Sequence, residues 1–273
     1  LRGGYSSIST DGFVTNDVLP NLIGLMYANS RTGLMKWNTP LWFLPCLYVV
    51  EVFAIIIERI LVHSSYISEK NMLRIGLSTC FAIIGFILFG QIYTDVFLPF
   101  HIETALILIM YFELGVFFQD FIKKEMHCDH KIMQLLVCLI LFGVGFILVK
   151  ANWLADIRLM KFGNSEILYV SASITNCLAL ILSSFLIEKS RMLEYIGRNT
   201  MKTLVMHKFP VLFFQTIVPI TANVFAKKSE TLLGCLIALI IALLCVYMCV
   251  IIGNYSEKMI PWLYGRNMGK KST

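Results

Sequence analysis

The sequence contains seven apolar runs that are each long enough to cross a lipid bilayer as a helix. A bilayer core of roughly 30 Å requires about 20 apolar residues per spanning helix. The runs are Pro40–Val62, Met72–Tyr93, Pro99–Phe118, Lys131–Lys150, Ile167–Ile187, Met201–Thr221 and Thr231–Ile252. Within lipid, such runs must satisfy their backbone hydrogen bonds internally, which favours helices over strands. The sequence therefore predicts an all-α, polytopic transmembrane helix bundle.

The composition excludes several other classes of protein. Hydrophobic residues make up 58% of the chain and charged residues only 15%, whereas soluble domains carry about 25% charged residues. The net charge of +6 is typical of loop charge that orients helices in a bilayer. A soluble enzyme, a disordered chain and a nucleic-acid binder are all excluded. Seven of the eight cysteines lie inside apolar runs, so no disulfide framework is implied.

The distribution of Lys and Arg predicts the orientation in the membrane. Alternate loops carry 14 of these cations on one side and 8 on the other. The richer side should be cytoplasmic, which places residues 1–39 outside and the tail 253–273 in the cytoplasm. We find no long linker and no internal repeat, so we expect one integral membrane domain over 1–273, with its membrane helices within 40–252.

The amino-terminal stretch is unusual for an integral membrane protein. The chain opens on Leu1, and the polar residues that follow lack the basic and apolar regions of a signal peptide. We therefore expect the chain to start internally, with earlier helices missing. The shorter apolar piece Val18–Ala28 is either an interfacial helix or the end of a lost span.

Two ionisable residues open the third apolar run, directly after Leu98-Pro99. His101 and Glu103 form a paired imidazole and carboxylate, which can orient one another for proton transfer. The alternative is a polar helix start in which the helix dipole favours Glu103. Both interpretations place the pair at the outer surface.

Other polar residues lie within the predicted spans. His207 lies close to the helix-breaking Pro210, and irregular backbone at membrane depth is tolerated where it lines a cavity or is buried in protein. His207 is thus either a substrate contact or a structural histidine, and Glu51 is either a helix-to-helix hydrogen-bonding group or a site residue. The tetrapeptide His127–His130 contains metal-ligand types, but we interpret it as a solvated loop and predict no metal site.

Three stretches together resemble a known family. They are Asn38-Thr-Pro-Leu-Trp-Phe-Leu-Pro45, Leu98-Pro-Phe-His-Ile-Glu-Thr-Ala-Leu106, and a third that runs from Phe162-Gly-Asn164 through Leu193-Glu-Tyr-Ile-Gly-Arg-Asn-Thr200 to Met206-His207. In order and spacing these resemble the acyltransferase type 3 membrane proteins, especially the fucose 4-O-acetylase-like branch. Glu103 stands where the family usually has Asp, and Phe100 where it has Trp.

The resemblance implies a fold and an activity. Members look like ten-helix enzymes that move a short acyl group from cytoplasmic acyl-CoA to a sugar hydroxyl, so the seven runs would be the last seven of ten. We expect acetyl-CoA as donor substrate, no bound cofactor, and a cell-envelope saccharide or lipid-linked sugar as acceptor, at a bacterial inner membrane. The family's catalytic His, preceded by an Arg on its first helix, has no counterpart here.

The resemblance also suggests site residues. His207, Glu103 and His101 are the candidates for catalysis. The candidates for substrate binding are Trp42, Asn164, Asn199 and Arg198. Arg198, with its neighbouring cations, could attract CoA phosphates because guanidinium forks suit phosphate oxygens, or it could serve only to enforce topology.

Two other functions stay open at this point. Related membrane proteins are sometimes described as exporters, and intramembrane Glu51 and His207 would suit a translocation path for polysaccharide or lipid-linked sugar. The chain could also be a truncated, inactive copy.

Overall fold

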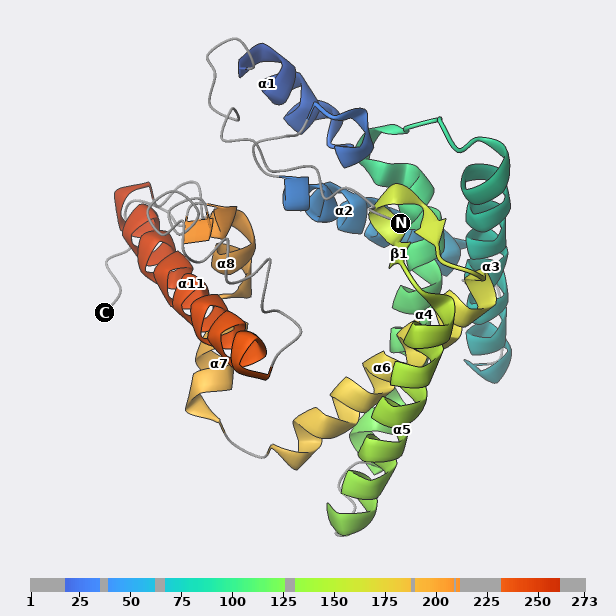
Figure 1. The fold of residues 1–273 in the computed structure, drawn as a ribbon. Coiled ribbons are helices and arrows are strands. Elements are labelled where there is room, and N and C mark those ends of the chain that lie inside the picture. The colour runs from blue at the N-terminus through green and yellow to red at the C-terminus, as the bar shows by residue number, and fades with distance from the viewer. Residues whose placement is uncertain are drawn as a thin grey trace, which may run out of the picture. The chain divides into compact units, whose positions relative to one another are not determined.

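The computed structural model describes residues 18–34, 39–61, 67–125, 131–187, 190–208, 210–211 and 232–260 (Figure 1). The chain divides into two compact units, Leu1–Glu188 and Lys189–Thr273. Within the described residues almost all regular structure is helical, which confirms the all-α expectation.

The first unit contains six α-helices and several short helical turns among its described residues. Its α-helices are α1 (Val18–Tyr27), α2 (Phe43–Ile60), α3 (Ile67–Ile87), α4 (Ile102–Glu125), α5 (Lys131–Asn152) and α6 (Glu166–Leu186). Its short turns are η3 (Ser30–Thr32), η4 (Thr39–Trp42), η6 (Leu88–Ile92), η7 (Pro99–His101) and η8 (Ile157–Leu159). A small antiparallel hairpin, β1 (Ala155–Asp156) and β2 (Lys161–Phe162), lies between α5 and α6.

Six helices in the described part of the chain are long and apolar enough to cross a membrane. They coincide with six of the seven predicted runs. In the remaining run, 201–221, the structure describes α8 (Thr200–Met206) and a few residues beyond it, and the rest lies outside the described residues. The apolar piece near the amino terminus forms α1, whose ten residues are too short to span.

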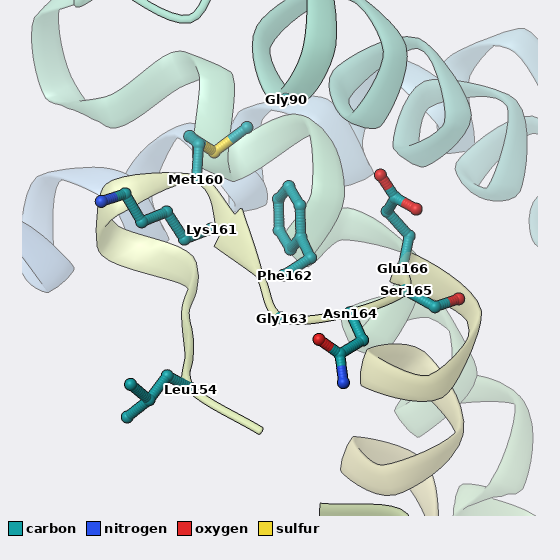
Figure 2. Close-up of a pocket in the computed structure, with 9 residues that line it drawn as sticks. All are labelled: Gly90, Leu154, Met160, Lys161, Phe162, Gly163, Asn164, Ser165 and Glu166. Carbon is teal, nitrogen blue, oxygen red and sulfur yellow. The ribbon is translucent and has the colours of Figure 1, made fainter. Parts of the chain in front are cut away.

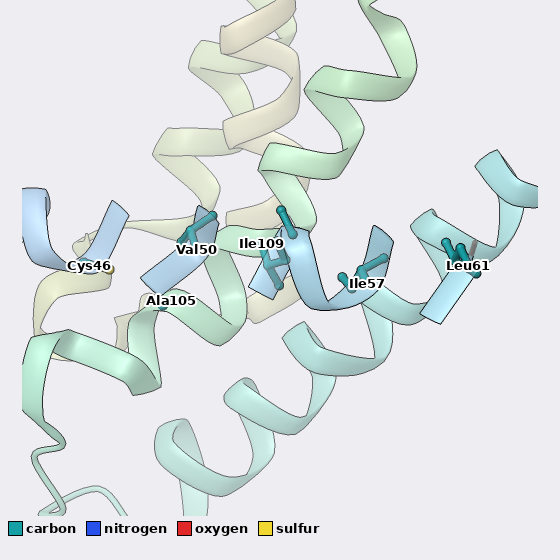
Figure 3. Close-up of a cluster of buried hydrophobic side chains, with 7 residues drawn as sticks. Cys46, Val50, Ile57, Leu61, Ala105 and Ile109 are labelled. Carbon is teal, nitrogen blue, oxygen red and sulfur yellow. The ribbon is translucent and has the colours of Figure 1, made fainter. Parts of the chain in front are cut away.

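Helix α4 is the central element of the first unit. Of its most apolar 18-residue window, 44% is buried, against 11–22% for the other spans. One face of α4 packs on α2, through a cluster of small and branched side chains that recurs every three or four residues along α2 (Figure 3). The buried members of this cluster are Cys46, Val50, Ala54, Ile57, Leu61, Ala105 and Ile109.

A second cluster joins α4 to α3 and to the hairpin. Its buried members are Ala82, Phe86, Ile107, Met110, Met160 and Phe162. The Phe162 ring packs edge-on against Phe86, with centroids 4.6 Å apart. The hairpin is therefore held on the core by its own apolar side chains.

Helix α5 shows how the unit meets lipid. Its mean hydropathy of 2.8 is the highest among the spans, yet only 11% of that window is buried. Such an apolar yet exposed surface is expected of a helix that faces acyl chains, because lipid tails are as apolar as a protein core.

The second unit contains α7 (Arg191–Arg198), α8 and α11 (Leu232–Met259) among its described residues. Helices α8 and α11 are joined by Lys202, whose Nζ lies 2.7 Å from Glu257 Oε2 and also donates to Asn254. At the point of contact α11 has Gly253, where a Cβ would lie 2.8 Å from Lys202 Cβ. The close approach of the two helices thus requires a glycine.

Candidate functional site

The polar cluster of the first unit lies at the amino-terminal end of α4. The chain enters this helix through η7, in which Phe100 and His101 have φ of +58° and +53°. Left-handed backbone at a residue other than glycine costs about 1–3 kcal/mol, and such strain gathers at functional sites. Two further strained residues, Ala28 and Met160, lie in the segments that pack against this end of α4. The strain marks this end of α4 as the candidate site.

Glu103 is the centre of the cluster and is fully buried, with 0% of its surface exposed. Its Oε1 accepts a 2.8 Å hydrogen bond from the side-chain amide of Asn29, and its Oε2 accepts one of 3.3 Å from the backbone N–H of Leu98. Asn29 also donates to the Leu98 carbonyl. The carboxylate is therefore held in one orientation by Asn29, which precedes it by 74 residues, and by the backbone of Leu98 just before the helix.

His101 is equally buried and has a defined tautomer. The backbone N–H of Ser30 donates to its Nε2 at 2.9 Å. A backbone amide can only donate, so Nε2 is the acceptor and the ring proton lies on Nδ1. Nδ1 lies 3.4 Å from Glu103 Oε1 and 3.3 Å from Thr104 Oγ1. The structure thus brings His101 and Glu103 together, as the sequence led us to expect, with the basic nitrogen turned toward η3.

Two groups complete the surroundings of the imidazole. The Trp42 ring packs on His101 with centroids 4.6 Å apart, which brings this predicted substrate-binding residue into the same cluster. The hydroxyl of Ser30 lies 3.0 Å from Nε2. Ser30 as a whole is partly buried, whereas the imidazole ring is fully buried.

Arg31 contributes a positive charge to the same end of α4. Its side chain is 8% exposed, with Nη1 3.9 Å from Glu103 Oε1 and the guanidinium 4.6 Å above the Phe97 ring. Nη2 donates to the Thr94 carbonyl, but Nη1 has no hydrogen-bond partner among the described residues. Burial lowers the pKa of Arg31, against the opposing effects of Glu103 and Asp95. The group nevertheless keeps its charge at neutral pH.

The hairpin covers this cluster from the α5–α6 loop. Thr104 Oγ1 donates to Met160 Sδ at 3.6 Å. The loop itself is fixed by Asn152, whose Nδ2 donates to the Phe162 carbonyl at 2.7 Å and whose Oδ1 accepts from Ser165 N–H at 3.0 Å. These two hydrogen bonds hold the loop against the carboxyl-terminal end of α5.

Asn164 lines a pocket on the hairpin of about 350 Å³ (Figure 2). The lining residues are Gly90, Leu154, Met160, Lys161, Phe162, Gly163, Asn164, Ser165 and Glu166. The side-chain amide of Asn164 donates to the Ala151 carbonyl at 2.8 Å, while Lys161 points away from Asn164. Met160 lines this pocket and its Sδ accepts from Thr104 Oγ1, which lies 3.3 Å from His101 Nδ1.

The remaining predicted site residues lie in the second unit and make local contacts there. His207 follows α8 and its Nδ1 donates to the Leu204 carbonyl at 2.8 Å. Asn199 lies between α7 and α8 and donates to the Tyr195 carbonyl at 2.8 Å. Arg198 forms an ion pair with Glu194 one turn earlier, with side chains 77% and 59% exposed. These three residues are described with their own unit, and their roles stay predictions.

The other candidates have different outcomes. Glu51 is exposed on α2 and makes no hydrogen bond or ion pair within the described residues. Among those residues, no group of three or more His, Cys, Asp or Glu side chains could hold a metal ion. The tetrapeptide His127–His130 is outside the described residues.

Sequence reasoning missed Asn29, Ser30 and Arg31. These three polar residues follow α1 directly and form the turn that contacts Glu103 and His101. The available signal was a compact polar run after an apolar segment, which is equally typical of any surface turn.

The comparisons with known proteins gave one match. The family model described as an acyltransferase domain, that of the acyltransferase type 3 proteins, matches residues 4–252. Neither the curated proteins nor the solved structures gave a significant match. The matched range spans both compact units and includes every residue of the polar cluster.

Proposed function

The chain belongs to the acyltransferase type 3 family of membrane proteins, and we propose that it transfers an acetyl or other short acyl group to a saccharide hydroxyl. The donor is acyl-CoA from the cytoplasm, and in the predicted orientation its acyl group has to pass through the helix bundle to reach His101 at the outer end of α4. The acceptor is a cell-envelope saccharide, free or lipid-linked, and the protein acts in the inner membrane with its carboxyl terminus in the cytoplasm.

The observation that carries this proposal is the orientation of His101. Transfer of an acyl group from a thioester to an alcohol needs a base that removes the alcohol proton. Nε2 of His101 is unprotonated and accepts the Ser30 backbone N–H, which has to move aside before the ring can take a proton there, while Nδ1–H faces the carboxylate of Glu103 at 3.4 Å. The Ser30 N–H fixes the tautomer, and a carboxylate at this distance stabilises the imidazolium that forms when the ring accepts a proton. His101 is thus the base in our proposal, and Glu103 is its positioning residue.

The second requirement is a donor for the negative charge that develops on the thioester oxygen. Arg31 provides an Nη1 that has no hydrogen-bond partner among the described residues, although it lies 3.9 Å from Glu103 Oε1, and Arg31 belongs to the same turn that contacts His101 Nε2. A buried guanidinium is a strong donor because few water molecules compete with it. We assign Arg31 this role.

The pocket beside the hairpin is our candidate for the acceptor. At about 350 Å³ it lies at the lower end of the range for small-molecule sites. It offers amide, hydroxyl, ammonium and carboxylate groups, the mixture of donors and acceptors that sugar hydroxyls require. In this proposal Asn164 keeps its predicted substrate-binding role. Trp42 packs against the imidazole ring of the base.

The test measures acetyl transfer by membranes that contain the full-length protein. Labelled acetyl-CoA is supplied with envelope saccharides, and wild type is compared with Glu103→Gln. We expect saccharide-bound acetyl from wild type and a loss of at least about tenfold in the variant, because the amide cannot stabilise the imidazolium. Absence of any transfer by well-expressed wild type would contradict the proposal and favour export of the saccharide.

A further inference from the structure

We propose that the acceptor saccharide is carried by a lipid, and that a hydrocarbon chain of this lipid lies in an apolar groove between α3 and α6. This inference rests on the proposed function and deepens it, because it narrows the acceptor from any envelope saccharide to a lipid-linked one. The groove is distinct from the polar pocket on the hairpin but adjoins it.

The groove has a volume of about 360 Å³, and all its lining residues lie in helices that are long and apolar enough to cross a membrane. Its walls are mostly apolar side chains from three helices: Ala82, Ile83 and Phe86 of α3, Met110 of α4, and Ile167 and Val170 of α6. Ala82 and Met110 are buried, whereas Ile83 and Ile167 are exposed. The groove therefore has a buried floor and a rim that faces the lipid.

The α3 side of the groove follows one face of the helix. Its members recur at positions 79, 82, 83, 86 and 87, which is the spacing of a continuous stripe on an α-helix. From Thr79 to Gln91 the stripe extends about 18 Å at 1.5 Å per residue. A bilayer core is roughly 30 Å thick, so the groove is about as deep as one leaflet.

The groove meets the polar pocket of the hairpin at the membrane surface. Glu166 lines both cavities, while Gly90 lines the pocket and its neighbour Gln91 lines the groove. Gln91 Nε2 donates to Glu166 Oε1 at 3.1 Å, and both residues lie at the ends of spans, Lys70–Ile92 and Glu166–Leu186. A molecule that occupies both cavities must therefore have a polar end at the surface and an apolar end within the bilayer.

The backbone at this junction is unusual. Gly90 and Gln91 belong to η6, a π-helical turn that follows α3. Such turns are rare and are frequent at functional sites. Gly90 packs against the Phe162 ring of the hairpin, where a Cβ would lie 3.0 Å from Cε2. The turn thus brings the end of α3 onto the hairpin, so that the two cavities adjoin.

A lipid-linked saccharide has the same division of polarity. The pocket offers sugar hydroxyls the side chains of Asn164, Ser165 and Glu166, which can donate and accept hydrogen bonds. The groove offers a hydrocarbon chain mostly apolar walls. A saccharide without a lipid would occupy the pocket alone.

The chain contributes position more than apolar affinity. Lipid tails are as apolar as the groove, so a chain gains little free energy when it moves there from the bilayer. Holding the chain beside α3 nevertheless keeps the attached sugar at the pocket, and a tether of this kind raises the effective concentration of the second group. We therefore expect the lipid to lower KM for the acceptor at unchanged kcat.

The first experiment compares one saccharide with and without its lipid. Full-length protein in phospholipid vesicles receives labelled acetyl-CoA and either the envelope glycolipid fraction or the saccharide released from that fraction by hydrolysis of the lipid linkage. We expect KM for the lipid-linked form to be at least about tenfold lower. Equal KM values would overturn the inference and leave the proposed function intact, whereas acetyl on neither form would contradict the proposed function itself.

Two neighbouring residues provide a matched pair of variants. Ile83 and Ile84 are both exposed on α3, but only Ile83 lines the groove. Ile83→Trp should narrow the groove and raise KM for the lipid-linked saccharide several-fold, with transfer to the released saccharide unchanged. Ile84→Trp adds the same bulk outside the groove and should leave both acceptors at wild-type values. Equal KM values for the two variants would contradict a role for the groove.

Photo-crosslinking identifies the occupant. Benzoylphenylalanine is placed at Ile83 or at Ile84, in vesicles that contain differently labelled glycolipid and phospholipid, and the ratio of the two labels on the protein is measured after irradiation. We expect this ratio to be several-fold higher at Ile83. Equal ratios at the two positions would show that the groove holds only bilayer lipid, and the inference would be rejected.

Discussion

Helix α4 holds two buried glutamates in contrasting surroundings. Glu103, at 0% exposure, lies 3.9 Å from the nearest guanidinium nitrogen and accepts hydrogen bonds from an amide side chain and a backbone N–H. Glu113, at 1% exposure, pairs directly with Arg74 at 2.9 Å. The two residues are about 15 Å apart along the helix axis at 1.5 Å per residue.

The Glu113 cluster is compensated charge by charge. Arg74 also contacts Glu58 at 3.2 Å, and Glu58 pairs in turn with Lys70. Two cations and two anions thus link α2, α3 and α4, and the described contacts include no imidazole or hydroxyl. Such a network joins helices but leaves no base in place for chemistry.

The difference teaches which buried charges to assign to function. Ionisable residues at membrane depth are functional candidates by default, yet of these two described clusters only the one around Glu103 combines an oriented imidazole, a neighbouring hydroxyl and strained backbone. Both clusters contain a buried glutamate and a neighbouring cation. Of the two, only the Glu103 cluster holds a nitrogen that is oriented to accept a proton.

The largest expected effect is a loss of acetyl transfer when the Glu103 cluster is changed. His101→Asn removes the base and keeps a residue that tolerates the left-handed backbone at φ +53°. We expect acetyl transfer to fall by about 10²–10⁴-fold, measured on membranes with labelled acetyl-CoA. Equal activity of this variant and wild type would place the base elsewhere, with His207→Ala as the next variant to assay.

The second prediction concerns the Glu113 cluster, where we expect a substitution to lower the stability of the protein and not its activity. Arg74→Met leaves Glu113 buried without its partner, which should cost about 3–5 kcal/mol in the free energy of unfolding. Thermal unfolding in detergent measures this loss. Adding Glu113→Leu should recover most of it, and transfer per folded molecule should stay near wild type. A selective loss of transfer by the stable double variant would show that this cluster also serves chemistry.

A third, smaller effect tests whether the covered site depends on the hairpin. Gly163 has φ +78°, and a Cβ there would collide with the Asn152 carbonyl oxygen. Gly163→Ala should therefore cost about 1–3 kcal/mol and reduce transfer by displacing the hairpin. Gly115→Ala in α4, where a Cβ meets nothing within 4 Å, is the control and should leave transfer unchanged. Unfolding temperature and acetyl transfer are measured for both.

The smallest expected effect concerns an exposed ion pair. Arg198→Ala breaks the contact with Glu194 on α7, and surface pairs contribute about 0–1 kcal/mol. If Arg198 binds CoA phosphate, its loss should raise KM for acetyl-CoA several-fold at unchanged kcat. Glu194→Ala breaks the same pair but keeps the cation, so its KM should stay at the wild-type value. Identical KM values for all three proteins would reduce Arg198 to a topological charge.

The membrane helices were predictable because a spanning helix is a local property of the chain. Length and apolarity alone decide whether about 20 consecutive residues can cross a bilayer, and six of the predicted runs are helices in the described structure. The same holds for the meeting of His101 and Glu103, which lie two residues apart at one helix start.

The partners of that pair were decided only by the tertiary structure. Asn29, Ser30 and Arg31 reach the site from a turn that precedes it by about 70 residues, and nothing local in a polar turn specifies which helix end it will cover. Likewise, Glu51 and Glu113 both fall within predicted spans, whereas packing exposes the first and pairs the second with Arg74. The apolar composition of a segment determines whether it enters the membrane. The packing of those segments against one another determines which polar atoms meet, and therefore which of them can exchange a proton.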